Sequence, residues 1–211
     1  GLCDVVIAGG VEMMSAVPMS GFHTRLHPEM VEESIGMGHT AERVAKQWGI
    51  TREQADAFAF GSQQKAVAAI QRGAFVNEIV PVPVPRVTWK GTKKSTVMTQ
   101  FAVDEMPRAE TTLEGLAKLK PAFSAKGVVT AGNASPLSDG SAALLLMSAD
   151  KAKELGLKPL ARLVTFAVAG VAPDLMGIGP IKAVPKALAQ AGLSLGDIKM
   201  IELNEAFAVQ G

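Results

Sequence analysis

The chain has 211 residues, with 21 Lys and Arg against 20 Asp and Glu, and hydrophobic side chains make up 48% of it. This length and apolar content suffice for one large domain or two modest ones with a sizeable core. The balanced charge argues against a nucleic-acid surface, and no apolar run approaches the roughly 18 residues that a membrane-spanning helix needs. The single cysteine excludes an internal disulfide framework and suits a reducing compartment.

The two ends of the sequence resemble cuts inside a longer protein. The first residues include neither an initiator Met nor a charged, signal-like start. The last residues stop about one turn into a predicted helix. We therefore expect an internal piece of a larger chain.

The first part of the chain predicts one strand and then helices. Residues 4–8 predict a fully buried strand because they are too apolar to alternate. Residues 11–38 show no clean periodicity and predict a loop with short helical pieces. Thr40 is a candidate N-cap for a helix over 41–47, which Gly49 would stop.

A capping box begins the longest predicted helix. Thr51 and Gln54 have the spacing at which each side chain satisfies the other's backbone N–H, and apolar residues repeat at helical spacing over 52–72. Residues 79–85 alternate proline with β-branched residues, which favours an edge strand or a polyproline stretch. Residues 86–99, basic and polar, predict a hairpin or an exposed loop.

The next part returns to mixed helix and strand. Residues 112–118 predict a short helix, and residues 128–135 predict extended chain rich in small residues. Residues 142–147 then predict a buried strand. Ser148 is a candidate N-cap for a helix over 149–155.

The last part predicts a strand over 161–169, a helix over 181–191 and a strand over 198–203. This order is typical of a right-handed βαβ unit on a mostly parallel sheet. The architecture expected is therefore the tail of one α/β domain, interrupted by an inserted and largely helical subdomain over about 11–127, and then the start of a second α/β domain.

The most suggestive polar pair follows the last predicted strand. Asn204 and Glu205 come directly after it, and open α/β sheets bind ligands at the carboxyl ends of their strands. Asn204 is also a candidate N-cap for a helix that starts at Ala206. From the residues alone, the cap is the favoured interpretation because caps are commoner than sites.

The histidines and the cysteine are weaker candidates. His23 and His27 are four apart, but Pro28 follows at once, so no helical metal pair and no metal site is predicted. Cys3 precedes a strand beside Asp4, whose negative charge disfavours the thiolate. It is therefore predicted to be a structural residue and not a nucleophile.

Two stretches of small residues are candidates to lie against a ligand. Residues 132–135 would suit the wall of a binding site. Residues 176–180 place glycines before a helix, where a phosphate or carbonyl can bind, although a simple turn with Pro180 at the helix start explains them equally well.

A series of short segments, in order along the chain, resembles the thiolase family. The first is Gly-Gly-Val-Glu-Met-Met-Ser at residues 9–15, and the last is Asn-Glu-Ala-Phe-Ala at residues 204–208. Together the segments cover essentially the whole chain, which makes the resemblance specific. The segments between these two are residues 37–42, 54–59, 119–123, 130–135, 138–143 and 176–180.

The resemblance implies a thiolase fold: paired βαβαβαββ domains in a layered α/β/α/β/α arrangement, incomplete here, with an inserted loop domain. Residues 1–10 and 128–150 would be the end of the N-terminal thiolase domain. Residues 11–127 would be the inserted loop domain, and residues 157–211 the start of the C-terminal thiolase domain.

The activity implied is cleavage of a 3-ketoacyl-CoA by CoA, as in fatty-acid β-oxidation, or the reverse condensation. The family transfers the acyl group through a cysteine acyl-enzyme. Its nucleophilic cysteine would lie before Gly1, and its histidine and second cysteine beyond Gly211, so Asn204 is the catalytic residue assigned to this chain. It would hold a water that helps form an oxyanion hole, and Glu205 would brace it. The 211 residues alone are expected to be inactive.

The resemblance also assigns residues to CoA, which is a substrate and not a permanently bound cofactor. Ser135 resembles the hydroxyl that hydrogen-bonds the pantetheine amide, and Arg108 matches an arginine at the adenine end. The remaining residues would line or flank the pantetheine tunnel: Ala131, Leu137, Met176, Phe207 and, close to it, Phe123.

Two positions depart from patterns within the family. Gly115 stands where a serine often contacts the adenine or its ribose, which removes that contact. Gly36 stands where acetoacetyl-specific biosynthetic enzymes carry a histidine, which favours the degradative 3-ketoacyl-CoA thiolases.

Acetoacetyl-CoA thiolase stays open as an alternative, as does a non-catalytic CoA- or lipid-binding relative. A homodimer or homotetramer is expected of the full-length protein, with no nucleic-acid partner and no membrane span. The bacterial cytoplasm is the default location, and a mitochondrial or peroxisomal one stays open.

Overall fold

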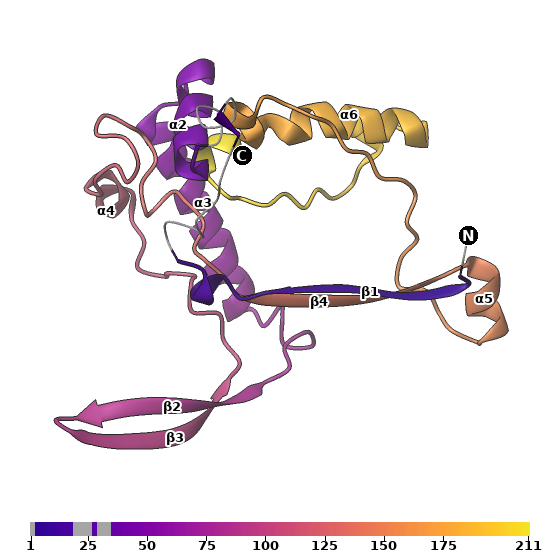
Figure 1. The fold of residues 1–211 in the computed structure, drawn as a ribbon, viewed down its shortest axis with the longest axis horizontal. Coiled ribbons are helices and arrows are strands. Elements are labelled where there is room, and N and C mark those ends of the chain that lie inside the picture. Colours follow the sequence, from indigo (N-terminus) through magenta and orange to yellow (C-terminus); the bar gives the residue numbers. More distant parts are fainter. Residues whose placement is uncertain (1–2, 19–26, 29–34) are drawn as a thin grey trace. The chain divides into compact units, whose positions relative to one another are not determined.

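The computed structural model describes residues 3–18, 27–28 and 35–211 (Figure 1). The chain divides into two compact units: Gly1–Ile50 with Ser135–Gly211, and Thr51–Ala134. Much of the loop predicted over 11–38, including His23, lies outside the described residues.

A two-stranded antiparallel sheet in the first unit joins β1 (Val5–Glu12) to β4 (Gly140–Met147). The register runs from the pair Val5 and Met147 to the pair Glu12 and Gly140, and Figure 1 shows the two strands side by side. The strands predicted at 4–8 and 142–147 are thus confirmed. The expectation that they are buried is wrong, because within the described part of the chain each strand pairs only with the other, and nearly all their residues are exposed.

Helix α2 (Met37–Trp48) supplies the core of the first unit. It begins one turn earlier than predicted: Gly36 is its N-cap, and the Thr40 hydroxyl donates to the Met37 carbonyl oxygen at 2.7 Å. The predicted cap at Thr40 is therefore wrong. The predicted stop at Gly49 is confirmed, since Gly49 adopts the left-handed conformation with φ 67° that ends helices.

One side of α2 packs against two short 3-10 helices, η2 (Pro173–Ile178) and η4 (Ala208–Gln210). The apolar residues of α2 recur at three- and four-residue spacing, so one stripe of the helix faces η2 and η4. The buried apolar residues of this small core are Ala41, Val44, Ala45, Ala208 and Val209.

The end of the first unit contains α5 (Ala149–Glu154) and α6 (Gly179–Ala191). Ser148 caps α5 by accepting from the Lys151 N–H at 3.1 Å, as predicted, and Pro180 lies in the first turn of α6. The first unit also contains the 3-10 helices η1 (Met14–Ala16) and η3 (Leu195–Asp197).

The predicted βαβ unit does not form in the described chain. Residues 161–169 and 198–203 have no regular secondary structure, and of the predicted unit only the intervening helix is present among the described residues. A strand requires a neighbour whose N–H and C=O groups complete a ladder, and neither segment has one among the described residues. The parallel sheet expected there is therefore a wrong prediction for this structure.

The second unit begins with α3 (Arg52–Gln71), the longest helix described. Its capping box is confirmed: the Thr51 hydroxyl accepts from the Gln54 N–H at 3.3 Å, and the Gln54 side chain accepts from the Thr51 N–H at 2.8 Å. A short helix α4 (Leu113–Ala117) follows later, with Thr112 as its cap. The extended chain predicted over 128–135 is instead mostly turn, with an isolated bridge at Thr130.

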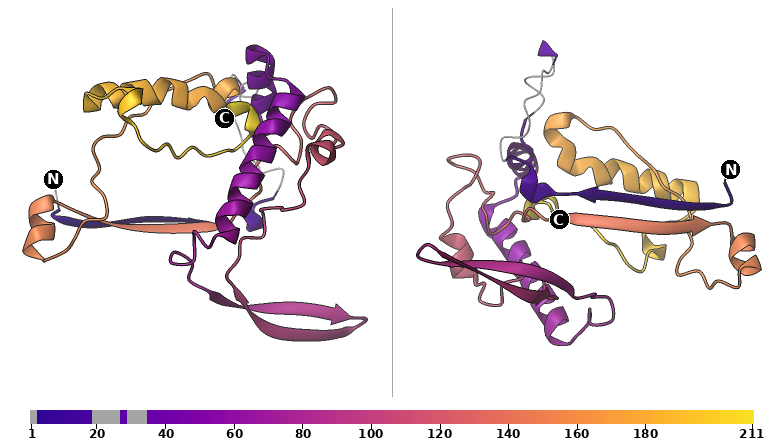
Figure 2. Two further views of the ribbon diagram at one scale, coloured as in Figure 1. Left: turned by 180° about the vertical axis from the view of Figure 1, so that it is seen from behind. Right: turned by 60° about the horizontal axis from the view of Figure 1, so that its bottom comes forward.

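A hairpin of β2 (Val82–Lys90) and β3 (Lys93–Phe101) projects from this unit (Figure 2). The proline-alternating stretch lies at the start of β2, where a two-stranded sheet leaves one edge unpaired and tolerates missing N–H donors. Gly91 in the connecting turn has φ 63°. The hairpin alternative for residues 86–99 is therefore confirmed.

Candidate active site

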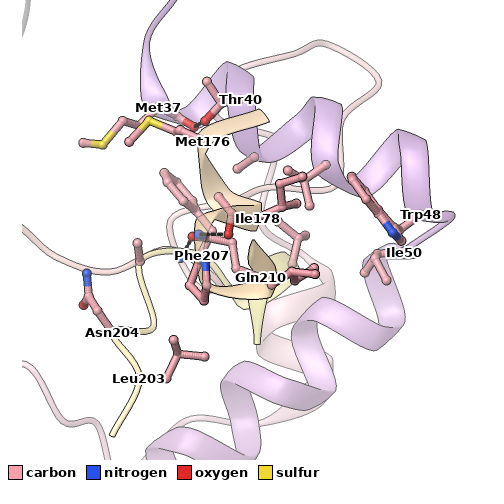
Figure 3. Close-up of a pocket in the computed structure, with 17 residues that line it drawn as sticks. Met37, Thr40, Trp48, Ile50, Met176, Ile178, Leu203, Asn204, Phe207 and Gln210 are labelled. Carbon is pink, nitrogen blue, oxygen red and sulfur yellow. Dashed lines mark hydrogen bonds between the residues drawn. The ribbon is translucent and has the colours of Figure 1, made fainter. Parts of the chain in front are cut away.

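A pocket of about 430 Å³ lies in the first unit, between α2, η2 and the last residues of the chain (Figure 3). Its lining is mostly apolar, and none of the described residues that line it is ionisable. Such a wall suits an apolar group held by shape and by a few neutral hydrogen-bonding groups. The lining residues are Met37, Thr40, Ala41, Val44, Trp48, Ile50, Met176, Gly177, Ile178, Pro180, Ile181, Leu203, Asn204, Ala206, Phe207, Val209 and Gln210.

Helix α2 forms one wall because of its apolar spacing. Met37, Ala41, Val44 and Trp48 fall on one side of a 3.6-residue helix. Residues 37–42 were expected only to resemble a family segment, and this wall was not predicted. The spacing of these four residues was the signal that could have revealed it.

Asn204 lies at the pocket on a segment without regular structure (Figure 3). Its residue is exposed, and its side-chain amide has no hydrogen-bond partner among the described residues. The interpretation of Asn204 as a helix cap is wrong, because η4 starts only at Ala208 and has Phe207 as its N-cap. The amide is therefore available to a ligand or a water.

Three of the residues assigned to CoA lie close to Asn204 in the chain's fold. Met176 and Phe207 line the same pocket. The Ser135 N–H donates to the Ala206 carbonyl oxygen at 2.9 Å, which ties Ser135 to the segment that carries Asn204 and Phe207. Leu137 follows two residues later, is 54% exposed and does not line the pocket.

The other three assigned residues, Arg108, Phe123 and Ala131, belong to the second unit. The Arg108 backbone N–H donates to Gln63 Oε1 at 2.8 Å, and the residue is exposed. Phe123 is 40% exposed, and Ala131 is exposed in the turn that precedes Asn133. Their roles toward CoA stay predictions.

Two contacts hold η2 in place around Met176. The Arg43 guanidinium on α2 forms a 2.6 Å ion pair with Asp174. On the other side, Gln210 Nε2 donates to the Gly177 carbonyl oxygen at 3.2 Å. The turn that carries Met176 is therefore held from both α2 and η4. Neither contact was predicted, because each joins residues far apart in the sequence.

Two carboxyl groups of the first unit have lowered pKa values, and neither belongs to a residue that lines the pocket. The Ser15 N–H and hydroxyl both donate to Asp139, at 2.8 Å each, and hold the pKa of that carboxyl below its usual value. The Ser194 hydroxyl and N–H lower the pKa of Asp197 in the same way. These groups fasten turns and do not reach the pocket.

The described residues contain neither a metal cluster nor a membrane-spanning helix. No cluster of three or more His, Cys, Asp or Glu residues suited to a metal occurs in the part of the chain that the structure describes. Within that same part, every helix is too short or too polar to cross a membrane. Cys3 is exposed and carries no disulfide.

The fold is shared with solved structures of one class of α/β enzyme. A crystal structure of the Bacillus anthracis acetyl-CoA acetyltransferase is similar, with a TM-score of 0.79 and 45% identity over 98% of this chain and 54% of that chain. The acetyl-CoA acetyltransferase from Syntrophomonas wolfei matches with the same TM-score at 40% identity. The mixed helix and strand structure is thus an incomplete form of that fold.

Two family models match nearly the whole sequence. The model for the N-terminal domain of thiolase matches residues 1–150, and the model for the C-terminal domain matches residues 157–211. The chain belongs to the thiolase family. The finer division of residues 1–150 into domain and insertion stays a prediction.

Named relatives agree with this assignment. The 3-ketoacyl-CoA thiolase of Bacillus subtilis is 51% identical over all of this chain and 55% of its own length. The acetyl-CoA acetyltransferase of Pseudomonas aeruginosa is 51% identical, and the human peroxisomal 3-ketoacyl-CoA thiolase is 49% identical. The chain spans about half the length of the curated relatives it matches.

Proposed function

We propose that the whole protein is an acyltransferase that cleaves 3-ketoacyl-CoA with CoA, giving acetyl-CoA and a shortened acyl-CoA. The observation that carries this proposal is the apolar pocket of a thiolase-family chain, with Met176 and Phe207 in its wall and Asn204 among its lining residues. The relatives named 3-ketoacyl-CoA thiolase support the same substrate class.

The reaction would proceed in two balanced steps. A cysteine thiolate outside these 211 residues attacks the keto carbon, the bond to the neighbouring carbon breaks, and the released acetyl-CoA carbanion takes up a proton. The thiol of CoA then attacks the acyl-enzyme thioester and regenerates the cysteine.

Within this chain, Asn204 would hold a water beside the thioester oxygen. A neutral amide suits this role because it can orient the water without bringing a charge into the site. The water then donates to the oxygen where negative charge develops, as in other oxyanion holes. Met176 and Phe207 would pack against the pantetheine arm or the acyl chain.

Acetyl-CoA acetyltransferase, acting on the four-carbon substrate, is the second candidate. Its support is the pair of relatives from Pseudomonas aeruginosa and Allochromatium vinosum that carry that name, at 51% and 48% identity. Gly36, in place of the histidine of biosynthetic enzymes, favours the first candidate.

A panel of 3-ketoacyl-CoA substrates, from four carbons upward, tests the proposal on the full-length protein. We expect CoA-dependent cleavage of substrates longer than four carbons. Activity confined to the four-carbon substrate would support the second candidate. Binding of CoA without any cleavage would support a non-catalytic relative.

We also propose that the full-length protein is a homodimer or homotetramer, and that it works in the bacterial cytoplasm. The bacterial relatives support this location, while the peroxisomal relatives of mouse and human keep an organelle open. Light scattering on the purified full-length protein measures the oligomeric state.

A further inference from the structure

The side chain of Gln210 makes two hydrogen bonds in opposite directions. Its Nε2 donates to the Gly177 carbonyl oxygen at 3.2 Å, and its Oε1 accepts from the Phe207 N–H at 3.1 Å (Figure 3). The residue is half-buried and lines the pocket. A planar amide with one donor end and one acceptor end suits this pair of partners.

These two bonds join separate parts of the pocket wall. Gly177 directly follows Met176 on η2, while Phe207 precedes η4, and 33 positions separate Gly177 from Gln210. The amide of Gln210 therefore connects the turn that carries Met176 to Phe207.

The packing at Gly177 is matched to the same amide. A Cβ atom added there would lie 2.9 Å from Gln210 Nε2 and 3.2 Å from its Cδ, closer than ordinary contacts allow. Gly177 is not among the glycines with positive φ, so its backbone would accept alanine. An added Cβ would therefore displace the end of the flexible Gln210 side chain.

We propose that Gln210 is a positioning residue that sets the width of the substrate pocket by bridging the Met176 turn to Phe207. This inference rests on the proposed function, because the pocket is taken to receive the substrate. Gln210 acts through the two walls and not on the reacting atoms. Its loss should weaken substrate binding more than it slows the chemical step.

The first test replaces Gln210 in the full-length protein. Q210L keeps the bulk of the side chain and removes both hydrogen bonds. The loss of one such bond typically changes an equilibrium constant by about a few-fold. We expect KM for a 3-ketoacyl-CoA and the dissociation constant for CoA to rise about fivefold to tenfold, with kcat within about twofold. Q47L is the matched control, since Gln47 is exposed on α2 and does not line the pocket.

The second test uses protonation to restore the bridge. In Q210E the carboxylate accepts from the Phe207 N–H but cannot donate to the Gly177 oxygen, whereas the protonated acid has the donor and acceptor of the original amide. The ratio of kcat/KM of Q210E to that of the parent should therefore rise as pH falls toward the pKa of the new carboxyl. A role in bulk packing alone would leave this ratio flat.

The third test is a double-mutant cycle between G177A and Q210A. G177A alone should raise KM because its Cβ displaces the amide, while in the Q210A background the clash is gone. The KM of the double variant should therefore stay within about twofold of the KM of Q210A. The effects of the two substitutions are then non-additive.

The possible outcomes separate this inference from the proposed function. A parent protein without cleavage of any 3-ketoacyl-CoA contradicts the proposed function. An active parent with unchanged KM in Q210L, a flat Q210E ratio or strictly additive effects in the cycle overturns the role of Gln210. If Q210L fails to fold, the Q210E ratio and the cycle still decide the question.

Discussion

The Asn133 side-chain amide donates to Asp56 Oδ1 at 2.9 Å, although the two residues lie 77 positions apart. Both residues are about 4% exposed. The second oxygen of Asp56 accepts from Arg52 Nε at 2.8 Å, and Asn133 Oδ1 accepts from the Thr130 N–H at 2.7 Å. This buried network connects the first turn of α3 to the segment that carries Ala131, a residue assigned to CoA.

The buried Asp56 carboxylate is expected to stabilise the second unit. D56A removes one acceptor from the Asn133 amide and one from the Arg52 guanidinium. The amide keeps its bond to the Val128 carbonyl oxygen, and the guanidinium keeps its bonds to backbone carbonyl oxygens. The loss of the Asp56 bonds should cost about 1–3 kcal/mol. Hydrogen exchange of the full-length protein should show lower protection at Thr130 and in residues 128–134. D56N, which keeps the shape and one acceptor, should lose less protection, and equal protection in D56A and the parent would contradict the account.

Gly132 is expected to tolerate no side chain. A Cβ atom there would lie 2.5 Å from Leu116 Cδ2 and from Leu119 Cδ1. Overpacking of this kind costs about 1–3 kcal/mol, so G132A should lower the thermal midpoint. G61A is the matched control of opposite sign: nothing lies within 4 Å of its added Cβ, and replacing glycine inside a helix by alanine stabilises by about 0.5–1 kcal/mol.

The capping box at Thr51 gives a smaller effect at one helix end. T51A removes the acceptor for the Gln54 N–H and should cost about 1 kcal/mol of stability. T51S retains the hydroxyl and should stay within about 0.5 kcal/mol of the parent. Equal thermal midpoints for T51A and T51S would show that the cap does not stabilise α3.

The contact between Ser15 and Asp139 depends on pH in a definite direction. The Ser15 N–H and hydroxyl lower the pKa of Asp139 below its ordinary value of 3.8. The contact therefore stabilises the fold above about that value, and this stabilisation is lost as pH falls through the lower folded-state pKa. NMR titration of the Asp139 carboxyl should show a higher pKa in S15A, and an unchanged pKa would contradict the assignment.

Local signals in the sequence predicted the helices well. The pair Thr51 and Gln54, the cap at Ser148 and the stop at Gly49 each act within a few residues, so the pattern contains the whole interaction. The prediction of Thr40 as an N-cap failed because a hydroxyl inside a helix can also donate to a preceding carbonyl oxygen. The Thr40 hydroxyl donates in this way to Met37.

The strands and the pocket depend on distant partners, which a local pattern does not contain. Residues 161–169 have the composition of a strand, but pairing needs a neighbour that the described residues do not supply. For the same reason, Asn204 could be singled out from its place after an apolar run, whereas Gln210 could not. The hydrogen bond from Gln210 to the Gly177 carbonyl oxygen joins residues 33 positions apart, so no local pattern contains it.

The role proposed for Asn204 is to hold a water at the oxyanion hole. In the full-length protein, N204A should lower kcat for CoA-dependent cleavage of a 3-ketoacyl-CoA longer than four carbons by about a hundredfold, because an oxyanion-hole contact is lost. KM and the thermal midpoint should change little. N77A, at an exposed asparagine of the second unit, is the control and should leave kcat unchanged. A kcat for N204A within about twofold of the parent would contradict the account.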